Sequence, residues 1–160
     1  MRHSLKALVF VLLLTIGLIL SFGVHESWAF SSDSNETTKA KDSQYEMAVQ
    51  AIKAKRWQPA IELLKKVAAR NPAHADAQNY LGYAYRHLGQ YGPALKHYKE
   101  ALSIDAKHRG AHEYIGETYL KLKQLDQAEK HLLALNEICF FGCEEYDELK
   151  EKIAAYKQVN

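Results

Sequence analysis

Hydrophobic, small and aromatic residues recur along this chain at one fixed interval. Within each interval they fall at steps of three and four, the spacing that places side chains on one face of an α-helix. Three copies of the pattern occupy residues 41–74, 75–108 and 109–142. A short helical pair cannot bury its apolar face alone, so the fixed period predicts a stack in which each copy packs against its neighbours.

Small residues hold matching positions in the copies. Gly82 and Gly116 lie in the middle of predicted helices, where glycine costs roughly 1 kcal/mol relative to alanine. Their recurrence predicts that two helices approach too closely there for a side chain. Larger residues fill the gaps. The predicted core consists of Met47, Leu64, Leu81, Tyr85, Leu88, Tyr98, Leu102, Ile115, Tyr119, Leu122 and Leu132.

The second copy, with YLGYAYRHLGQYGPALKHYKEALSID at residues 80–105, resembles a tetratricopeptide repeat. The third copy keeps most of the pattern, and the first is degenerate, with Ala48 and Ala51 where glycine and tyrosine are usual. The resemblance implies an all-α fold, a right-handed α-solenoid of three helix pairs over residues 43–142 followed by a capping helix over residues 143–160. The signature offsets are held by Leu81, Gly82, Tyr85, Ala94, Tyr98 and Ala101.

Residues 1–29 have the pattern of an export signal. Arg2 and Lys6 precede an uncharged, mostly apolar stretch at residues 7–24, and Ser27 and Ala29 are small residues suited to a signal peptidase. The apolar stretch also reaches the lower length limit of a membrane-spanning helix, so an uncleaved anchor stays open. In either case the basic residues on the amino side place the repeats outside the cytoplasm, in the periplasm or the medium.

Residues 30–42 are mostly Ser, Asp, Asn, Glu, Thr and Lys, with little that could form a core. This composition predicts a flexible linker between the signal and the repeats. At the other end, Tyr146, Leu149, Ile153 and Tyr156 follow one helical face after residue 143. A helix of this kind would cover the apolar end of the stack.

Both cysteines, Cys139 and Cys143, lie where the last repeat ends. In an exported protein, two cysteines so close favour a structural disulfide. Free thiols and a redox-active or metal-binding pair are the alternatives. The spacing of the cysteines, with Phe140, Phe141 and Gly142 between them, is longer than that of the thioredoxin-type motif, and zinc would need ligands that no nearby cysteine can supply.

The chain shows no catalytic motif. Gly-rich phosphate loops, HExxH and GxSxG are absent from the sequence, so we expect no enzyme activity, no cofactor and no catalytic residue. His74 matches His108 and His97 matches His131 at the repeat period, which indicates shared repeat ancestry rather than a metal site. With 21 Lys and Arg against 19 Asp and Glu, the charge gives no reason to expect nucleic acid as a partner.

The family resemblance implies that the first helices of successive repeats line a concave groove that binds the partner. Tyr83 and Arg86 are the strongest candidates, because tyrosine and arginine are common binding hot spots. The family's clamp for a C-terminal carboxylate needs lysine, asparagine and arginine at offsets where this chain has other residues, which disfavours binding of chaperone tails. The groove-facing offsets fall on Tyr45, Val49, Ile52, Asn79, Tyr83, Arg86, Glu113, Glu117 and Leu120.

These observations favour a non-catalytic adaptor or scaffold of the periplasm or cell envelope that binds a peptide or protein segment in the groove. One alternative is a membrane-tethered assembly factor, of the cytochrome-maturation or secretion type, held by an uncleaved segment at residues 7–24. The other is a thiol redox protein using Cys139 and Cys143. Membrane association is expected only through the N-terminal segment, and the sequence identifies neither the partner nor the oligomeric state.

Overall fold

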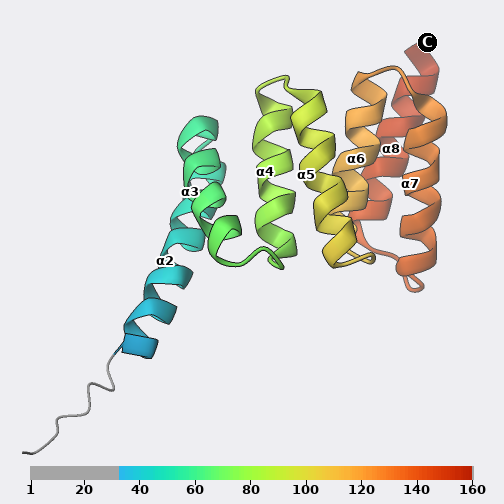
Figure 1. Cartoon of the computed structure of the whole chain (residues 1–160). Helices are drawn as coiled ribbons and strands as arrows, with labels where there is room; N and C mark the ends of the chain where they lie inside the picture. The colour runs from blue at the N-terminus through green and yellow to red at the C-terminus, as the bar shows by residue number, and fades with distance from the viewer. Residues whose placement is uncertain (1–32, 160) are drawn as a thin grey trace, which may run out of the picture. The chain divides into compact units, whose positions relative to one another are not determined.

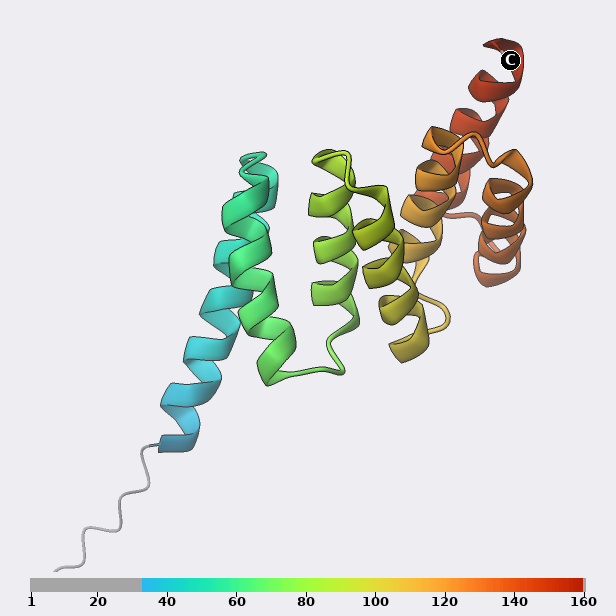
Figure 2. The same cartoon turned by 45° about the horizontal axis from the view of Figure 1, so that its top comes forward.

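The computed structural model describes residues 33–159, with side chains from residue 43. This part of the chain contains helices and no strand, which confirms the predicted all-α solenoid (Figures 1 and 2). From residue 35 onward the described residues form one compact unit. The predicted signal segment at residues 1–29 lies outside the described residues. The helices are α2 (Asp33–Lys53), α3 (Trp57–Arg70), α4 (Ala75–His87), α5 (Tyr91–Ile104), α6 (Arg109–Lys121), α7 (Leu125–Ile138) and α8 (Glu144–Val159).

From α3 to α8 each helix packs on its neighbours in the chain, and α8 packs on both α6 and α7. The buried residues of α2 share a core cluster with those of α3. The first helix of each copy also covers the second helix of the copy before it. Leu81 of α4 shares a core cluster with α3, Ile115 of α6 shares one with Tyr98 of α5, and Leu149 of α8 shares one with Leu135 of α7. Since Leu81, Ile115 and Leu149 follow one another at the repeat period, α8 occupies the place of the first helix of a fourth copy.

The equivalent histidines have a structural role at helix starts. The Nδ1 atom of His74 accepts a hydrogen bond from the Ala77 N–H at the start of α4, at 3.3 Å. His108 does the same for the Ala111 N–H at the start of α6, at 3.1 Å. Both side chains satisfy backbone donors that would otherwise lack a partner. The shared repeat position is therefore explained by helix capping.

The recurring glycines lie at close helix contacts, as predicted. A Cβ atom on Gly82 would stand 2.5 Å from the ring of Tyr98 on α5, and one on Gly116 would stand 2.5 Å from Leu149 on α8. Real Cβ atoms do not approach so closely, so these positions admit no side chain unless the neighbour moves. Tyr98 and Leu149 are both fully buried, which leaves them little room to move.

Part of the predicted core is wrong. Leu64, Leu81, Tyr98 and Ile115 are buried, but Met47 is 53% exposed. Met47 matches Leu81 and Ile115 in the repeat. The second helix of the preceding copy covers Leu81 and Ile115, but the described residues contain no such helix before α2, so Met47 stays exposed. Leu88 and Leu122 are also exposed. Both are the residue that ends a first helix, at the turn into the second, where less of the stack covers them. Tyr85, Leu102, Tyr119 and Leu132 are half-buried.

The predicted linker also differs from the structure, because residues 33–42 continue α2 as helix. The stretch contains neither proline nor glycine. Once the packed turns of α2 have formed, each added residue gains a backbone hydrogen bond without a new nucleation step. Low hydrophobicity did not exclude a helix that extends from the packed turns of α2.

The loop between α7 and α8 carries both cysteines, as the sequence indicated. Their Cα atoms lie 5.6 Å apart, within the range that a disulfide spans. The structure thus brings the two thiol positions together at the entry to α8.

Among the described residues, no helix has both the length and the apolarity required to cross a bilayer.

A pair of histidines lies between α6 and α7. The Nε2 atom of His112 is 3.1 Å from the Ala106 carbonyl, so this nitrogen carries the proton and donates it. The Nδ1 atom of His112 then accepts, and the Nδ1–H of His131, at 3.0 Å, donates to it. Burial, aided by His112 and then Lys99, lowers the pKa of His131 to about 4.

Replacing Gly82 by alanine should lower the free energy of unfolding by about 1–3 kcal/mol, because the new methyl group overlaps the buried ring of Tyr98. Gly92→Ala is the matched control, since Gly92 lies in a helix with no atom near its Cβ position. Equilibrium denaturation with urea measures both. Equal stability of the Gly82 variant and the wild type would contradict the close-packing account.

The titration of His131 should make the folded state less stable as the pH falls from 6.5 toward 4. The folded state holds His131 neutral down to a pKa of about 4, whereas the unfolded chain takes up the proton near pH 6.5, so acid favours unfolding across that window. We expect His131 to account for about 2 kcal/mol of this loss. His131→Asn keeps an N–H donor and cannot titrate. Denaturation across this range should show a shallower pH slope for this variant, and an unchanged slope would exclude the role of His131.

Candidate functional site

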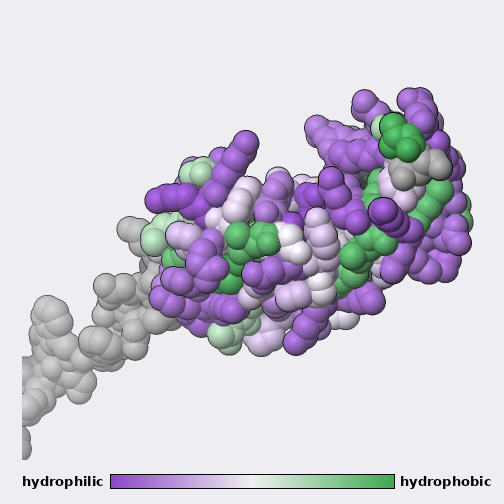
Figure 3. All heavy atoms as spheres, turned by 90° about the horizontal axis from the view of Figure 1, so that it is seen from above, coloured by the Kyte–Doolittle hydropathy of each residue, from purple (hydrophilic) through white to green (hydrophobic). Residues whose placement is uncertain are grey.

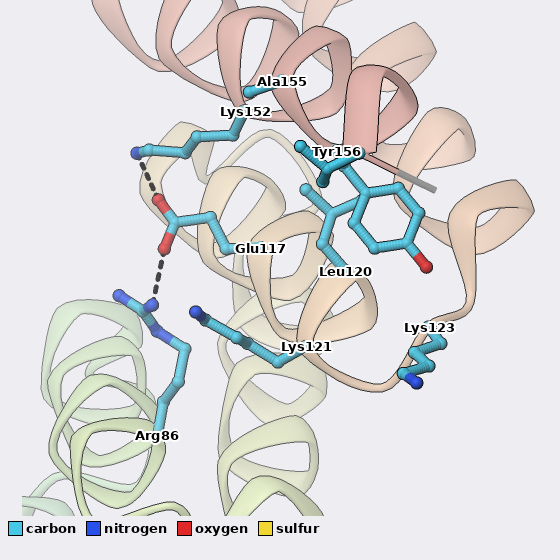
Figure 4. Close-up of a pocket in the computed structure, with 9 residues that line it drawn as sticks. Arg86, Glu117, Leu120, Lys121, Lys123, Lys152, Ala155 and Tyr156 are labelled. Carbon is cyan, nitrogen blue, oxygen red and sulfur yellow. Dashed lines mark hydrogen bonds and ion pairs between the residues drawn. The ribbon is translucent and has the colours of Figure 1, made fainter.

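A cavity of about 740 Å³ opens beside the first helices α4 and α6 and the C-terminal helix α8 (Figure 4). Its volume lies within the range of sites that hold ligands or side chains of a partner. Apolar groups from α6 and α8 form part of its wall, and three lysines and an arginine contribute positive charge. The lining residues are Arg86, Glu117, Leu120, Lys121, Lys123, Lys152, Ala155, Tyr156 and Val159.

A network of charges joins the three helices at one side of this cavity. The Lys152 ammonium on α8 donates to Glu113 at 3.2 Å, to Glu148 at 2.8 Å and to Glu117. Glu117 also accepts from Arg86 of α4 at 2.5 Å. Figure 4 shows Glu117 between the two cations. Because Arg86 and Glu117 are nearly buried, each depends on the other for compensation of its charge.

Two neighbouring aromatic rings contact Arg86. Its guanidinium carbon lies 5.2 Å from the ring centre of Tyr83 and 5.4 Å from that of Tyr114. The two rings are themselves 4.9 Å apart. A cation over ring faces is attracted by the negative face of each ring. Arg86 is therefore fixed between α4 and α6.

Burial and neighbouring charges shift the pKa values in this network. Burial, followed by the Glu117 carboxylate, raises the pKa of Glu113 well above its usual range, although Lys152 opposes the shift. The hydrogen bond from Lys152 lowers the pKa of the more exposed Glu148. The raised pKa favours the neutral form of Glu113, and the carboxylates of Glu117 and Glu148 face the cations Arg86 and Lys152.

Carboxylate oxygens of Glu113, Glu117 and Glu148 lie within 4.8 Å of one another, which raises the question of a metal ion. The ammonium of Lys152 contacts all three of these side chains. It therefore already supplies positive charge to the place where a bound cation would be held. This arrangement explains the acidic cluster as part of the packing between α6 and α8.

The structure separates the predicted groove residues into groups. Tyr83, Arg86 and Glu117 come together in the network described above, and Leu120 lines the cavity. Asn79 and Glu113, each 5% exposed, are buried. Buried side chains do not contact a partner directly in this conformation. A second hollow of about 890 Å³, between α2 and α3, contains Tyr45 and Val49, while Ile52 is in the core beneath it.

Three buried polar atoms have no hydrogen-bond partner in the described part of the chain, namely Asn79 Oδ1, Arg86 Nε and Tyr98 Oη. The hydroxyl of Tyr98 interacts electrostatically with Arg86, so a small adjustment would pair the two. The Asn79 amide lies on α4 beneath the groove. The other polar atom of this amide, Nδ2, packs against Gly110, where an added Cβ atom would lie 3.3 Å from it.

Sequence reasoning missed the contribution of α8 to the site. Lys152, Ala155 and Tyr156 line the cavity, whereas the sequence assigned this helix only the role of a cover. The repeat period held a signal, because Leu149 lies one full period after Ile115. Extending the register by one copy would have identified α8 as another groove-lining first helix.

The model of one family, described as "Anaphase-promoting complex, cyclosome, subunit 3", matches residues 53–135. The chain belongs to this family. The match spans most of the three predicted repeats and agrees with the resemblance to tetratricopeptide repeats. Among curated proteins, none matches the chain.

Solved structures share the fold at low sequence identity. SycD, a type III secretion translocator chaperone of Yersinia enterocolitica, is 18% identical with a TM-score of 0.70, over 76% of this chain and 86% of SycD. PcrH, in complex with the chaperone-binding region of PopD, is 18% identical with a TM-score of 0.69, over 76% and 94%. The first tetratricopeptide domain of Spaghetti (RPAP3), bound to an HSP90 peptide, is 20% identical with a TM-score of 0.64, over 72% and 90%. These similarities establish the solenoid fold.

Replacing Glu117 by glutamine should lower the free energy of unfolding by about 2–3 kcal/mol, because it leaves the nearly buried Arg86 without its counter-charge. Glu148→Gln is the control. The Glu148 side chain is 45% exposed, and loss of its pair with Lys152 should cost no more than about 0.5 kcal/mol. Chemical denaturation compares the two variants. An equal loss of unfolding free energy in the two variants would show that Glu117 is not the counter-charge on which buried Arg86 depends.

Proposed function

Because the chain belongs to a family of helical repeats, we propose that it is a non-catalytic adaptor that binds a segment of a partner protein in the cavity beside α4, α6 and α8. The observation that carries the proposal is the composition of this cavity. Leu120, Ala155 and Tyr156 offer apolar surface, and Lys121 and Lys123 stand beside it without an ion pair among the described residues. Apolar anchors surrounded by polar groups are typical of protein-binding sites.

Structures of the same fold support a peptide as the ligand. SycD has been solved in complex with a peptide of the translocator YopD, PcrH with a region of PopD, and the RPAP3 domain with an HSP90 peptide. A rigid stack of helices presents a surface that need not reorganise on binding, which limits the entropy lost in the complex. By this analogy of fold, the present chain also binds an extended or helical segment.

The structure changes the roles that we assign to the predicted residues. Arg86 and Glu117 hold α4, α6 and α8 together, and Tyr83 supports Arg86, so these side chains shape the wall of the site. Direct contact with the partner falls to Leu120 and Tyr156, with Lys121 and Lys123 at the edge. Substitution of Arg86 would therefore change partner binding indirectly, by destabilising the packing of the cavity wall. It is a poor test of direct binding.

We further propose that the protein acts outside the cytoplasm, with Cys139 and Cys143 joined as a disulfide. The export-signal pattern of residues 1–29 supports this location. An oxidising compartment preserves disulfides, and the proximity of the two cysteines supports the pairing. Intact mass of the native protein tests both points. A chain that begins at residue 30 has lost the signal and one that retains residues 1–29 is tethered, while a mass two hydrogens below that of the reduced chain indicates the disulfide.

A photo-crosslinking residue in place of Lys121 should capture the partner in cells that export the protein. The same residue in place of Lys99 is the control, because Lys99 is exposed on the second helix α5 and does not line the cavity. We expect an adduct from position 121 that disappears when Leu120 is also changed to aspartate, because the acidic group removes the apolar anchor. The mass of the adduct identifies the partner. Adducts of equal yield from both positions would contradict a site in this cavity.

A further inference from the structure

The loop between α7 and α8 exposes two phenylalanines. Phe140 is 86% exposed and Phe141 is 96% exposed. Their rings meet edge to face with centres 5.1 Å apart, and Cys139 and Cys143 bracket them in the chain. We call Phe140 and Phe141 the aromatic tip. Two adjacent aromatic rings in water are a marker of an interaction surface, and a cysteine-bracketed loop limits the conformational entropy lost on binding.

Equivalent loops elsewhere in this chain lack such rings. The turn after α3 has Pro72 and Ala73, and the turn after α5 has Ala106 and Lys107, each pair one or two repeat periods before the aromatic tip. The repeat architecture therefore does not require aromatic residues at this position. The aromatic tip is a feature of the last turn alone among these loops.

Carboxylates surround the aromatic tip. Glu137 precedes it, and Glu144 and Asp147 follow it in the first turn of α8. None of these three makes an ion pair within the described part of the chain. Glu145 is paired with Arg109 at 3.6 Å. A surface that combines two exposed rings with unpaired acids fits a partner site that combines apolar walls with unpaired cations.

The cavity beside α6 and α8 has that complementary character. Its apolar walls include Leu120 and Tyr156, and its edge carries Lys121 and Lys123. Figure 3, viewed onto the end where the C terminus lies, shows hydrophobic residues gathered near the C terminus and surrounded by hydrophilic ones. With a volume of about 740 Å³, the cavity has room for the paired rings of the aromatic tip.

The aromatic tip cannot reach the cavity of its own chain. Lys121 and Lys123 lie at the turn before α7, and the aromatic tip lies at the turn after it. The 14 residues of α7 separate these two ends by roughly 20 Å. The rings therefore lie at the opposite end of the helix pair from the cavity edge, where the described residues of the chain leave them exposed.

We propose that the aromatic tip of one copy of this protein binds in the cavity of a second copy. Phe140 and Phe141 enter against Leu120 and Tyr156, while Glu144 and Asp147 pair with Lys121 and Lys123. This contact joins two different surfaces, so it is heterologous and leaves a free aromatic tip and a free cavity at the ends of each assembly. This inference rests on the proposed function in one respect, that both use the same cavity as a binding site. It adds that a second copy of the protein occupies the cavity.

Sedimentation velocity over a range of concentrations tests the proposal on the native exported protein. The wild type should associate as concentration rises. The tip variant, Phe140→Ser with Phe141→Ser, and the cavity variant, Lys121→Glu with Lys123→Glu, should each weaken association by at least about tenfold. Lys66→Glu with Lys99→Glu, on exposed parts of α3 and α5, should associate like the wild type. Circular dichroism confirms that the variants are folded.

Mixing the two defective variants separates this contact from other forms of aggregation. Each mixed pair retains one intact aromatic tip and one intact cavity, so the mixture should form dimers and nothing larger. The oxidised peptide of residues 136–148, NEICFFGCEEYDE, should compete with association of the wild type. A wild type that stays monomeric at all concentrations, a tip variant that associates like the wild type, or a mixture that stays monomeric would overturn the proposal.

The two proposals can fail independently. If the protein is monomeric but the crosslinker at position 121 captures a different protein, the second copy is excluded and the adaptor stands. If the crosslinked adduct has twice the mass of the chain, and no other protein is captured, the self-association stands and the adaptor function falls.

Discussion

The close contact between a glycine on one helix and a large buried side chain on a later helix sets how near the helices from α4 to α8 approach one another. Gly82 admits the ring of Tyr98, and Gly116 admits Leu149. Without these approaches the helices would stand farther apart, and the side chains between them could not fill the space. The Gly82 contact joins the two helices of the second copy, and the Gly116 contact joins the third copy to α8, so close approaches hold helices together both within a copy and at the end of the stack.

The charge network is a consequence of that packing. Once α4, α6 and α8 lie side by side, Arg86, Glu117 and Lys152 meet at their common surface, together with the buried Glu113. A charge taken out of water needs a partner, and here each group finds one on a neighbouring helix. The network thereby fixes the wall of the cavity and leaves Lys121 and Lys123 as the charges available to a ligand.

The two ends of the stack differ in chemistry. At the α2 end, Ser43, Met47 and Gln50 hold the positions that Ala77, Leu81 and Ala84 hold in the next copy. Ala77, Leu81 and Ala84 are buried, whereas Ser43, Met47 and Gln50 are exposed. Two of these exposed residues are polar, as expected for the outer face of a repeat at the end of a stack. At the α8 end, the apolar cavity and the aromatic tip remain uncovered within the described residues. This difference makes the C-terminal part of the solenoid the place to look for partners.

The sequence by itself determined the all-α repeat, its register, the close approaches at Gly82 and Gly116 and the last helix, because these follow from local periodicity. It also placed Tyr83, Arg86 and Glu117 on one face. Only the tertiary structure decided that Arg86 is bound by Glu117 and two rings, that Asn79 and Glu113 are buried, that Met47 is exposed, and that Lys152 and Tyr156 of α8 complete the site. Burial and charge pairing depend on which helix lies alongside, and periodicity within one helix does not contain that information.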